Sequence, residues 1–175
     1  MVTERLQIRQ IALMAMLTAM CVVLRIFKII PIPNVQPVTD ILMIVTLNLG
    51  IGSGITLAAL TMLISNIYLG FGIWTIPQIL AYAGCILTVA FLAKVLPLQN
   101  HFWLQVILAT FLGWEYGFLV DLGMTIFGGL PAFIAYLVSS FAFDTYHAIG
   151  NFAFYFVLYK PVTKALENYQ RRMIQ

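Results

Sequence analysis

Charged side chains are almost absent from the middle of this sequence. Over residues 41–143 the only strong acids or bases are Lys94, Glu115 and Asp121. The whole chain is 62% hydrophobic and 9% charged, whereas a soluble domain carries about 25% charged residues. The charged surface that keeps a domain in water cannot be built from this composition. The sequence therefore predicts a single integral membrane domain over residues 1–175.

Apolar runs separated by glycine, proline and polar residues predict an all-α fold with six membrane-spanning helices. The expected helices cover about residues 7–27, 41–49, 55–69, 76–96, 102–124 and 145–166. The second is short, since a span needs roughly 20 residues, and we expect it to be tilted or partly buried by its neighbours. No internal repeat of fixed period is visible, which argues against an inverted-repeat transporter.

Residues 127–143 are the ambiguous part of the chain. Two glycines and Pro131 break the stretch, and the apolar run of about ten residues that follows is too short to span a membrane. We expect a third outer loop with a short re-entrant or interfacial helix, after which Asp144 caps the last helix. The alternative is one long helix over residues 131–159.

Lysines and arginines are unequally distributed between the two sides of the predicted bundle. Seven lie on the side of both chain termini and two on the other: Arg5, Arg9, Lys94, Lys160, Lys164, Arg171 and Arg172 against Arg25 and Lys28. The positive-inside rule then places both termini in the cytoplasm. The net charge of +3 reflects this clustering at the termini and does not predict nucleic-acid binding.

The segment IPNVQPVTD, residues 32–40, forms one of three glycine- or proline-rich loops on the predicted outer side. Its prolines fix φ and remove amide donors, so we expect a stiff, extended loop whose last residue also caps the next helix. This loop is predicted to form one wall of a pocket for a small, partly polar ligand. Its candidate ligand-binding residues are Asn34, Gln36, Thr39 and Asp40. The alternative is that the two amides only satisfy backbone groups of the loop.

Two further segments bring polar or aromatic groups to the same side. The loop GFGIWTIP holds Trp74, and Gln78 and Tyr82 follow at positions i and i+4, which share a helix face. His147 and Asn151 lie on one face of the last helix, and we expect both to hydrogen-bond the ligand. An aromatic and two amides at a pocket mouth suit a ligand with a flat, conjugated part. The alternatives are an interfacial anchor for Trp74 and a satisfied core histidine for His147.

Three charged residues within or near the spans need an explanation. A charge at the position of Glu115, near the centre of the fifth helix, costs at least about 2.5–3.5 kcal/mol, so Glu115 is protonated, paired or in a wet cavity. Arg25 lies near the outer end of the first helix and is within reach of Asp121. No positive residue is expected deep in the pocket, which argues mildly against a strongly anionic ligand.

No catalytic signature stands out in the sequence. The motifs GxSxG, HExxH and Walker A do not occur, and the two cysteines lack zinc spacing. We therefore expect no enzyme activity, no metal and no cofactor. Energy for uphill transport would have to come from another protein.

Alanines form a stripe on the first helix. Ala12, Ala15 and Ala19 fall at i, i+3 and i+7, and small residues at this spacing let another helix approach closely in lipid. We interpret the stripe as a docking face for a partner membrane protein. Ordinary packing within the chain is the alternative.

Taken in order, four of these features resemble the substrate-binding S components of energy-coupling factor (ECF) transporters for vitamins. They are the Ala15-xxx-Ala19 stripe, the NVQPVT loop, the GFGIWTIPQILAYAG stretch and the DTYHAIGN run. The resemblance covers nearly the whole chain. It implies a vitamin pocket open to the outside, a membrane coupling (T) subunit that grips the first helix, and two cytoplasmic ATPase subunits. It also implies a multi-pass protein of the prokaryotic cell membrane, and that the whole subunit topples in this membrane to release its vitamin inside.

The NVQPVT loop and its tryptophan-bearing partner look most like the branch that includes the cobalamin (vitamin B12) S components. Pantothenate or another water-soluble vitamin is the alternative ligand. A stand-alone secondary carrier or an integral membrane enzyme is the alternative class, and it would be active in liposomes without partners.

Overall fold

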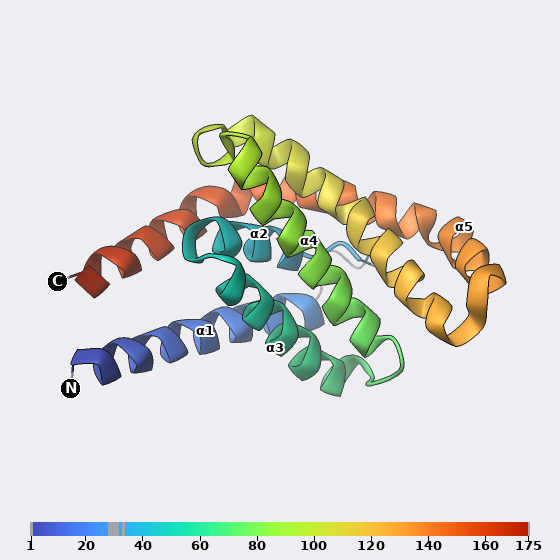
Figure 1. Ribbon diagram of the computed structural model, residues 1–175, viewed down its shortest axis with the longest axis horizontal. Helices are drawn as coiled ribbons and strands as arrows, with labels where there is room; N and C mark the ends of the chain where they lie inside the picture. Colours follow the sequence, from blue (N-terminus) through green and yellow to red (C-terminus); the bar gives the residue numbers. More distant parts are fainter. Residues whose placement is uncertain (1, 28–31, 33, 175) are drawn as a thin grey trace.

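The chain is all-helical in its computed structural model, which describes the backbone of residues 2–27, 32 and 34–174 and the side chains of all of these except 2–5 and 174. Over these residues there is no strand, which confirms the predicted all-α class. The elements are α1 (Val2–Ile26), α2 (Val38–Leu49), α3 (Ile51–Leu69), α4 (Thr75–Val95), the short 3-10 helix η1 (Leu98–Asn100) and α5 (Phe102–Ile174) (Figure 1). The predictions for Lys28 and for Pro33 of the 32–40 loop lie outside the described residues.

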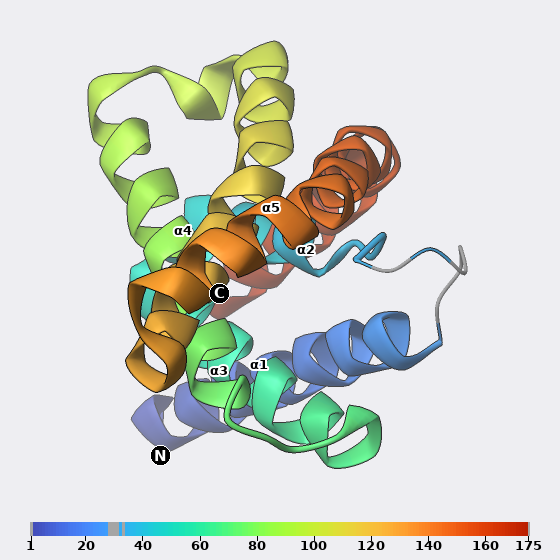
Figure 2. The same cartoon turned by 90° about the vertical axis from the view of Figure 1, so that its right-hand side faces the viewer.

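The helix α2 lies inside the bundle. Its residues 38–46 are all buried, and it contacts α3, α4 and α5. A helix that is surrounded by protein does not have to cross the bilayer by itself, which explains why the VTDILMIVTLNL sequence can be short. The expectation that neighbours bury this helix is confirmed. Figure 2 shows α2 enclosed between α1 and α3 on one side and α5 on the other.

The start of α2 differs from the prediction. Asp40 was expected to cap the helix from the end of an extended loop, but α2 begins at Val38, with Pro37 at the N-cap position and no side-chain cap. Proline suits a helix start because its φ is preset and its missing N–H has no partner there in any case. Thr39 and Asp40 are consequently buried in the first turn of a core helix.

The helix α5 is one element with a sharp bend. Its backbone leaves helical geometry at Gly129, with φ of 67° and ψ of −170°, a conformation that glycine adopts without strain. Pro131 then occupies the first turn of the following segment, where it is tolerated. We refer to residues 102–128 as the first arm and residues 130–174 as the second arm.

Two predictions about residues 127–144 are wrong, because the second arm is helical throughout. The expected outer loop with a short re-entrant helix is wrong, and Asp144 lies within the helix and does not cap it. The alternative of one long helix from Pro131 describes the structure better, and this helix continues past Tyr159 to Ile174. The glycine at the bend absorbs the change of direction, so no loop is needed.

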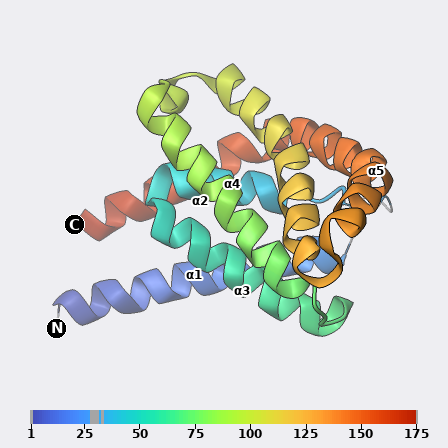
Figure 3. The same ribbon diagram turned by 45° about the vertical axis from the view of Figure 1, so that its right-hand side comes forward.

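The two arms of α5 pack closely through a pair of glycines. A Cβ atom on Gly113 would lie 2.5 Å from the backbone nitrogen of Ala148, and one on Gly117 would collide with the carboxyl group of Asp144. This Gly113-xxx-Gly117 pair lets two helices approach as small residues do in membranes generally. The first arm also packs on α4, which in turn packs on α3 (Figure 3).

Within the described residues, four helices have the length and hydropathy to cross a membrane: Leu6–Ile26, Ile51–Leu69, Thr75–Val95 and Phe102–Met173, the last bent at Gly129. Both chain ends lie at the same end of the bundle (Figure 1). There Nη1 of Arg9 donates to the carbonyl of Arg172 at 3.1 Å. Six spans with cytoplasmic termini remain a prediction.

Candidate functional site

Five of the nine predicted ligand-binding residues lie together in the closed core of the bundle. Thr39 and Asp40 come from α2, Tyr82 from α4, and His147 and Asn151 from the second arm of α5, and all five are fully or almost fully buried. They do not line an open mouth. The sequence placed them on the correct elements and overestimated their exposure, because it did not anticipate that α2 would be central.

Thr39 joins three of the core elements. Its Oγ1 lies 2.8 Å from Nε2 of His147 and donates to the Tyr82 hydroxyl at 3.5 Å. Tyr116, which the sequence analysis missed, completes the group: its ring centroid is 4.2 Å from that of Tyr82 and 5.4 Å from that of His147. Its neighbour Gly117, within the GxxxG pair, was the one available signal that Tyr116 faces the second arm.

Several polar atoms of this core have no hydrogen-bond partner among the described residues. They are both carboxylate oxygens of Asp40, Nδ1 of His147 and Oδ1 of Asn151, whereas Nδ2 of Asn151 donates to the Ala109 carbonyl at 3.0 Å. Buried polar groups are nearly always paired, so such a concentration of unpaired ones needs an explanation. Bound water or a polar ligand would supply the missing partners.

A second polar group lies beside the first and contains Gln78. Nδ2 of Asn66 donates to Oε1 of Gln78 at 2.9 Å and to Oγ1 of Thr75 at 3.0 Å. Oδ1 of Asn66 accepts from Nη1 of Arg25 at 2.7 Å, and the same nitrogen contacts Ser65.

The position of Arg25 in the structure shows that two predictions were wrong. It contacts α3 and does not pair with Asp121, whose Oδ2 accepts instead from the Ser140 hydroxyl at 2.7 Å. Arg25 is also only 7% exposed, so a positive residue does lie inside the bundle next to predicted site residues. The sequence could not show this, because the direction in which a residue at a helix end points depends on the packing of α1 against α3.

The three remaining predicted site residues lie at the edge of the bundle. Asn34 and Gln36 are partly buried, and Asn34 has a φ of 63°, which asparagine tolerates better than most residues. Trp74 is 44% exposed in the turn before α4, with its ring packed over Gly72. Their positions fit a rim around the core group, and also fit the interfacial anchor that was the alternative for Trp74.

Glu115 is the remaining acid near the middle of a helix. Its Oε1 accepts from Thr88 at 2.6 Å, and its Oε2 has no partner among the described residues. No described carboxylate, histidine or cysteine cluster has the make-up of a metal site.

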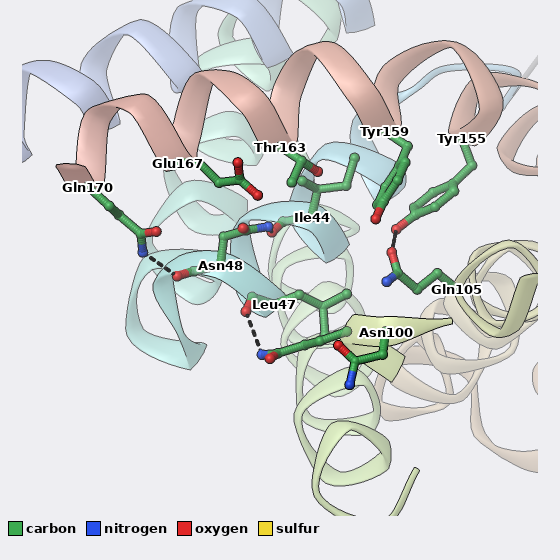
Figure 4. Close-up of a pocket in the computed structure, with 11 residues that line it drawn as sticks. Ile44, Leu47, Asn48, Asn100, Gln105, Tyr155, Tyr159, Thr163, Glu167 and Gln170 are labelled. Carbon is green, nitrogen blue, oxygen red and sulfur yellow. Dashed lines mark hydrogen bonds between the residues drawn. The ribbon is translucent and has the colours of Figure 1, made fainter. Parts of the chain in front are cut away.

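A polar cavity of about 380 Å³ lies at the other end of α4 from Trp74 (Figure 4). It includes Gln105, which accepts a hydrogen bond from the Tyr155 hydroxyl, and Gln170, whose Nε2 donates to the Asn48 carbonyl at 2.7 Å. None of the nine predicted ligand-binding residues lines it. This cavity was not predicted from the sequence.

The alanine stripe faces outward. Ala12, Ala15 and Ala19 are all exposed. Ala15 and Ala19 line a groove of about 420 Å³ between α1 and α3, whose other wall includes Leu60, Ile64 and Tyr68. The stripe is therefore free of packing within the described part of the chain, which leaves it accessible to another helix.

These features define the class of protein: a helical membrane protein with an apolar exterior and polar side chains gathered inside. The chain belongs to the family of ECF transporter substrate-specific components, whose family model matches residues 9–159. It is thus a substrate-specific membrane subunit of an ECF transporter, and the resemblance found in the sequence is confirmed. No curated protein and no solved structure matches the chain.

Proposed function

We propose that this subunit binds a water-soluble vitamin from outside the cell and delivers it by toppling on a membrane coupling subunit driven by two ATPases. The observation that carries the proposal is the family match together with the group of buried, incompletely paired polar residues on α2, α4 and α5. Asn34, Gln36 and Trp74 would form the rim of the site. The core residues Thr39, Asp40, Tyr82, His147 and Asn151, with Gln78 beside them, would hydrogen-bond the polar part of the vitamin.

Cobalamin is the first candidate ligand because of the NVQPVT loop and its tryptophan-bearing partner. Pantothenate is the second, and the buried guanidinium of Arg25 is the observation that favours it, since pantothenate carries a carboxylate. The alanine groove supports the coupling subunit as a partner, because an exposed small-residue stripe suits close helix contact in lipid.

The proposal is tested by identifying what the chain binds and what drives it. Purified chain, once denatured, should release a vitamin that mass spectrometry identifies. Uphill uptake in proteoliposomes should require the coupling subunit and active ATPases. Equal uptake with ATPase-dead partners would contradict the proposal and favour a stand-alone secondary carrier.

Residues of the rim should affect affinity more than folding. We expect Trp74→Ala to weaken vitamin binding by about 10-fold or more, because a tryptophan at a binding surface is commonly worth at least ~1–2 kcal/mol. Asn34→Ala should have a smaller effect in the same direction. Both are measured by isothermal titration of the purified chain with the vitamin that co-purifies.

Trp103→Ala is the matched control, since this tryptophan is 63% exposed at the start of the first arm, away from the rim. Unchanged affinity in Trp74→Ala and Asn34→Ala would remove both residues from the site and leave Trp74 as a membrane anchor.

A further inference from the structure

Arg25 is a buried cation whose described hydrogen-bond partners are all neutral. It lies in the last turn of α1 and is 7% exposed. Nη1 donates to Oγ of Ser65 and to Oδ1 of Asn66. An arginine is charged at every physiological pH, so this charge cannot be removed by losing a proton.

The hydrogen bonds around Arg25 fix the orientation of its acceptors. Oγ of Ser65 donates to the Thr61 carbonyl and is left to accept from the guanidinium. The amide nitrogen of Asn66 is used by Thr75 and Gln78, so only its oxygen faces Arg25. The surroundings are thus arranged to accept hydrogen bonds from Arg25, but they contribute no negative charge.

No carboxylate among the described side chains lies within 4.0 Å of the guanidinium. Asp121 interacts with Ser140, and Glu115 interacts with Thr88. The side chain of Glu4 is outside the described residues, but its backbone is 21 residues away on the same helix, about 31 Å along the axis. The C-terminal end of α1 offers only a partial negative charge of about half a unit.

The guanidinium of Arg25 has donors that no described residue uses, on an edge whose geometry suits oxyanions. A guanidinium has five N–H groups, and the two on Nη1 face Ser65 and Asn66. No hydrogen bond to a described residue uses Nε or Nη2. The N–H groups of these two nitrogens point along parallel directions and match the two oxygens of a carboxylate or phosphate in a bidentate pair.

This edge lies in the region assigned to the ligand. Asn66 connects Arg25 to Gln78, a predicted ligand-binding residue that lies one turn before Tyr82 on α4. We propose that the Nε and Nη2 edge of Arg25 binds an oxyanion of the transported ligand, either a carboxylate or a phosphodiester. This inference rests on the proposed function. The ligand would supply the counter-charge that the described part of the chain lacks, and a ligand without an anionic group would be bound poorly.

The first test compares charged and neutral probes on the full chain, purified in a phosphate-free maltoside detergent. The probes are pantothenate and its neutral alcohol pantothenol, biotin and biotinamide, and cyanocobalamin, which carries a phosphodiester. We expect the Arg25→Gln variant to bind the vitamin about 10- to 100-fold more weakly than wild type does, because this is the range for losing a hydrogen bond to a charged group. If the bound vitamin is pantothenate or biotin, the wild-type chain should bind it about 10- to 100-fold more tightly than its neutral counterpart, pantothenol or biotinamide.

Arg9→Gln is the matched control, because it makes the same change on the same helix at an exposed position. Equal affinity of wild type and Arg25→Gln for the bound vitamin would overturn the inference and leave the proposed function intact. Failure of every vitamin to bind wild type would overturn both. An effect of Arg25→Gln that appears only when phospholipid is added back would identify a lipid phosphate as the partner, and would also overturn the inference.

The second test supplies the missing charge from within the chain. Asn66→Asp places a carboxylate where Oδ1 already accepts from Nη1, so Arg25 becomes ion-paired. The variant loses the two hydrogen bonds that Nδ2 donates, but the Thr75 hydroxyl and a turned Gln78 amide can donate to the new oxygen. We expect the variant to remain folded, as its thermal midpoint will show, and its affinity for the anionic vitamin to fall at least about 10-fold. Unchanged vitamin affinity in Asn66→Asp would show that Arg25 has only a structural role. This variant keeps the inference testable even if Arg25→Gln does not fold.

Discussion

Replacing Ala15 and Ala19 together by tryptophan should abolish the association of this subunit with its coupling subunit while leaving vitamin binding unchanged. Both alanines are exposed and line the groove between α1 and α3. A helix that approaches closely over small residues cannot do so over two indole rings, and in lipid no hydrophobic driving force compensates for the lost contact. We expect co-purification of the two subunits to fall below detection.

Ile107→Trp with Phe111→Trp is the matched control for this experiment. These residues have the same spacing, are also exposed, and lie on the first arm of α5. Co-expression with an affinity-tagged coupling subunit provides the measurement, and titration with the vitamin monitors the ligand site. Survival of the complex in the alanine double variant would show that the partner docks on a different face.

Substitution of Gly113 by alanine should destabilise the fold, because overpacking a tight contact usually costs about 1–3 kcal/mol. The added Cβ would lie 2.5 Å from the backbone nitrogen of Ala148, and a helix backbone cannot rotate away as a side chain can. Alanine favours a helix over glycine by about 1 kcal/mol. The measured decrease in the free energy of unfolding is therefore the cost of the clash minus this gain in helix propensity. Thermal unfolding in detergent measures it.

Gly52→Ala is the control for Gly113→Ala. Gly52 also lies in a helix, but a Cβ atom there would meet nothing within 4 Å. The same chemical change should therefore be neutral or stabilising by up to about 1 kcal/mol. Equal thermal unfolding midpoints for the two variants would mean that the arms of α5 separate easily. The glycine pair would then not be a determinant of the fold.

Local composition was sufficient to predict most of the helices. The short apolar run 41–49 and its expected burial were recognised because a run too short to span needs protein around it. The placement of His147 and Asn151 on one helix face followed from spacing alone, and both are buried in the core. What these residues bind remains a prediction.

The errors arose where tertiary contacts override local signals. Asp144 resembled an N-cap after a broken segment, but the bend at Gly129 leaves the second arm uninterrupted at that position. Arg25 was assigned to Asp121 on charge alone, whereas the packing of α1 on α3 directs it to Asn66. Tyr116 carried no signal of its own, because an aromatic residue in an apolar helix is as compatible with a lipid-facing position as with the core.

The second arm of α5 has a mechanical consequence. Figure 3 shows that this arm changes direction along its length, and Pro161 lies within it. Proline removes a backbone hydrogen bond and kinks a helix. The part that carries His147 and the part that ends in the basic turn at Arg172 are therefore not one rigid rod, and a tilt of one part is not transmitted in full to the other.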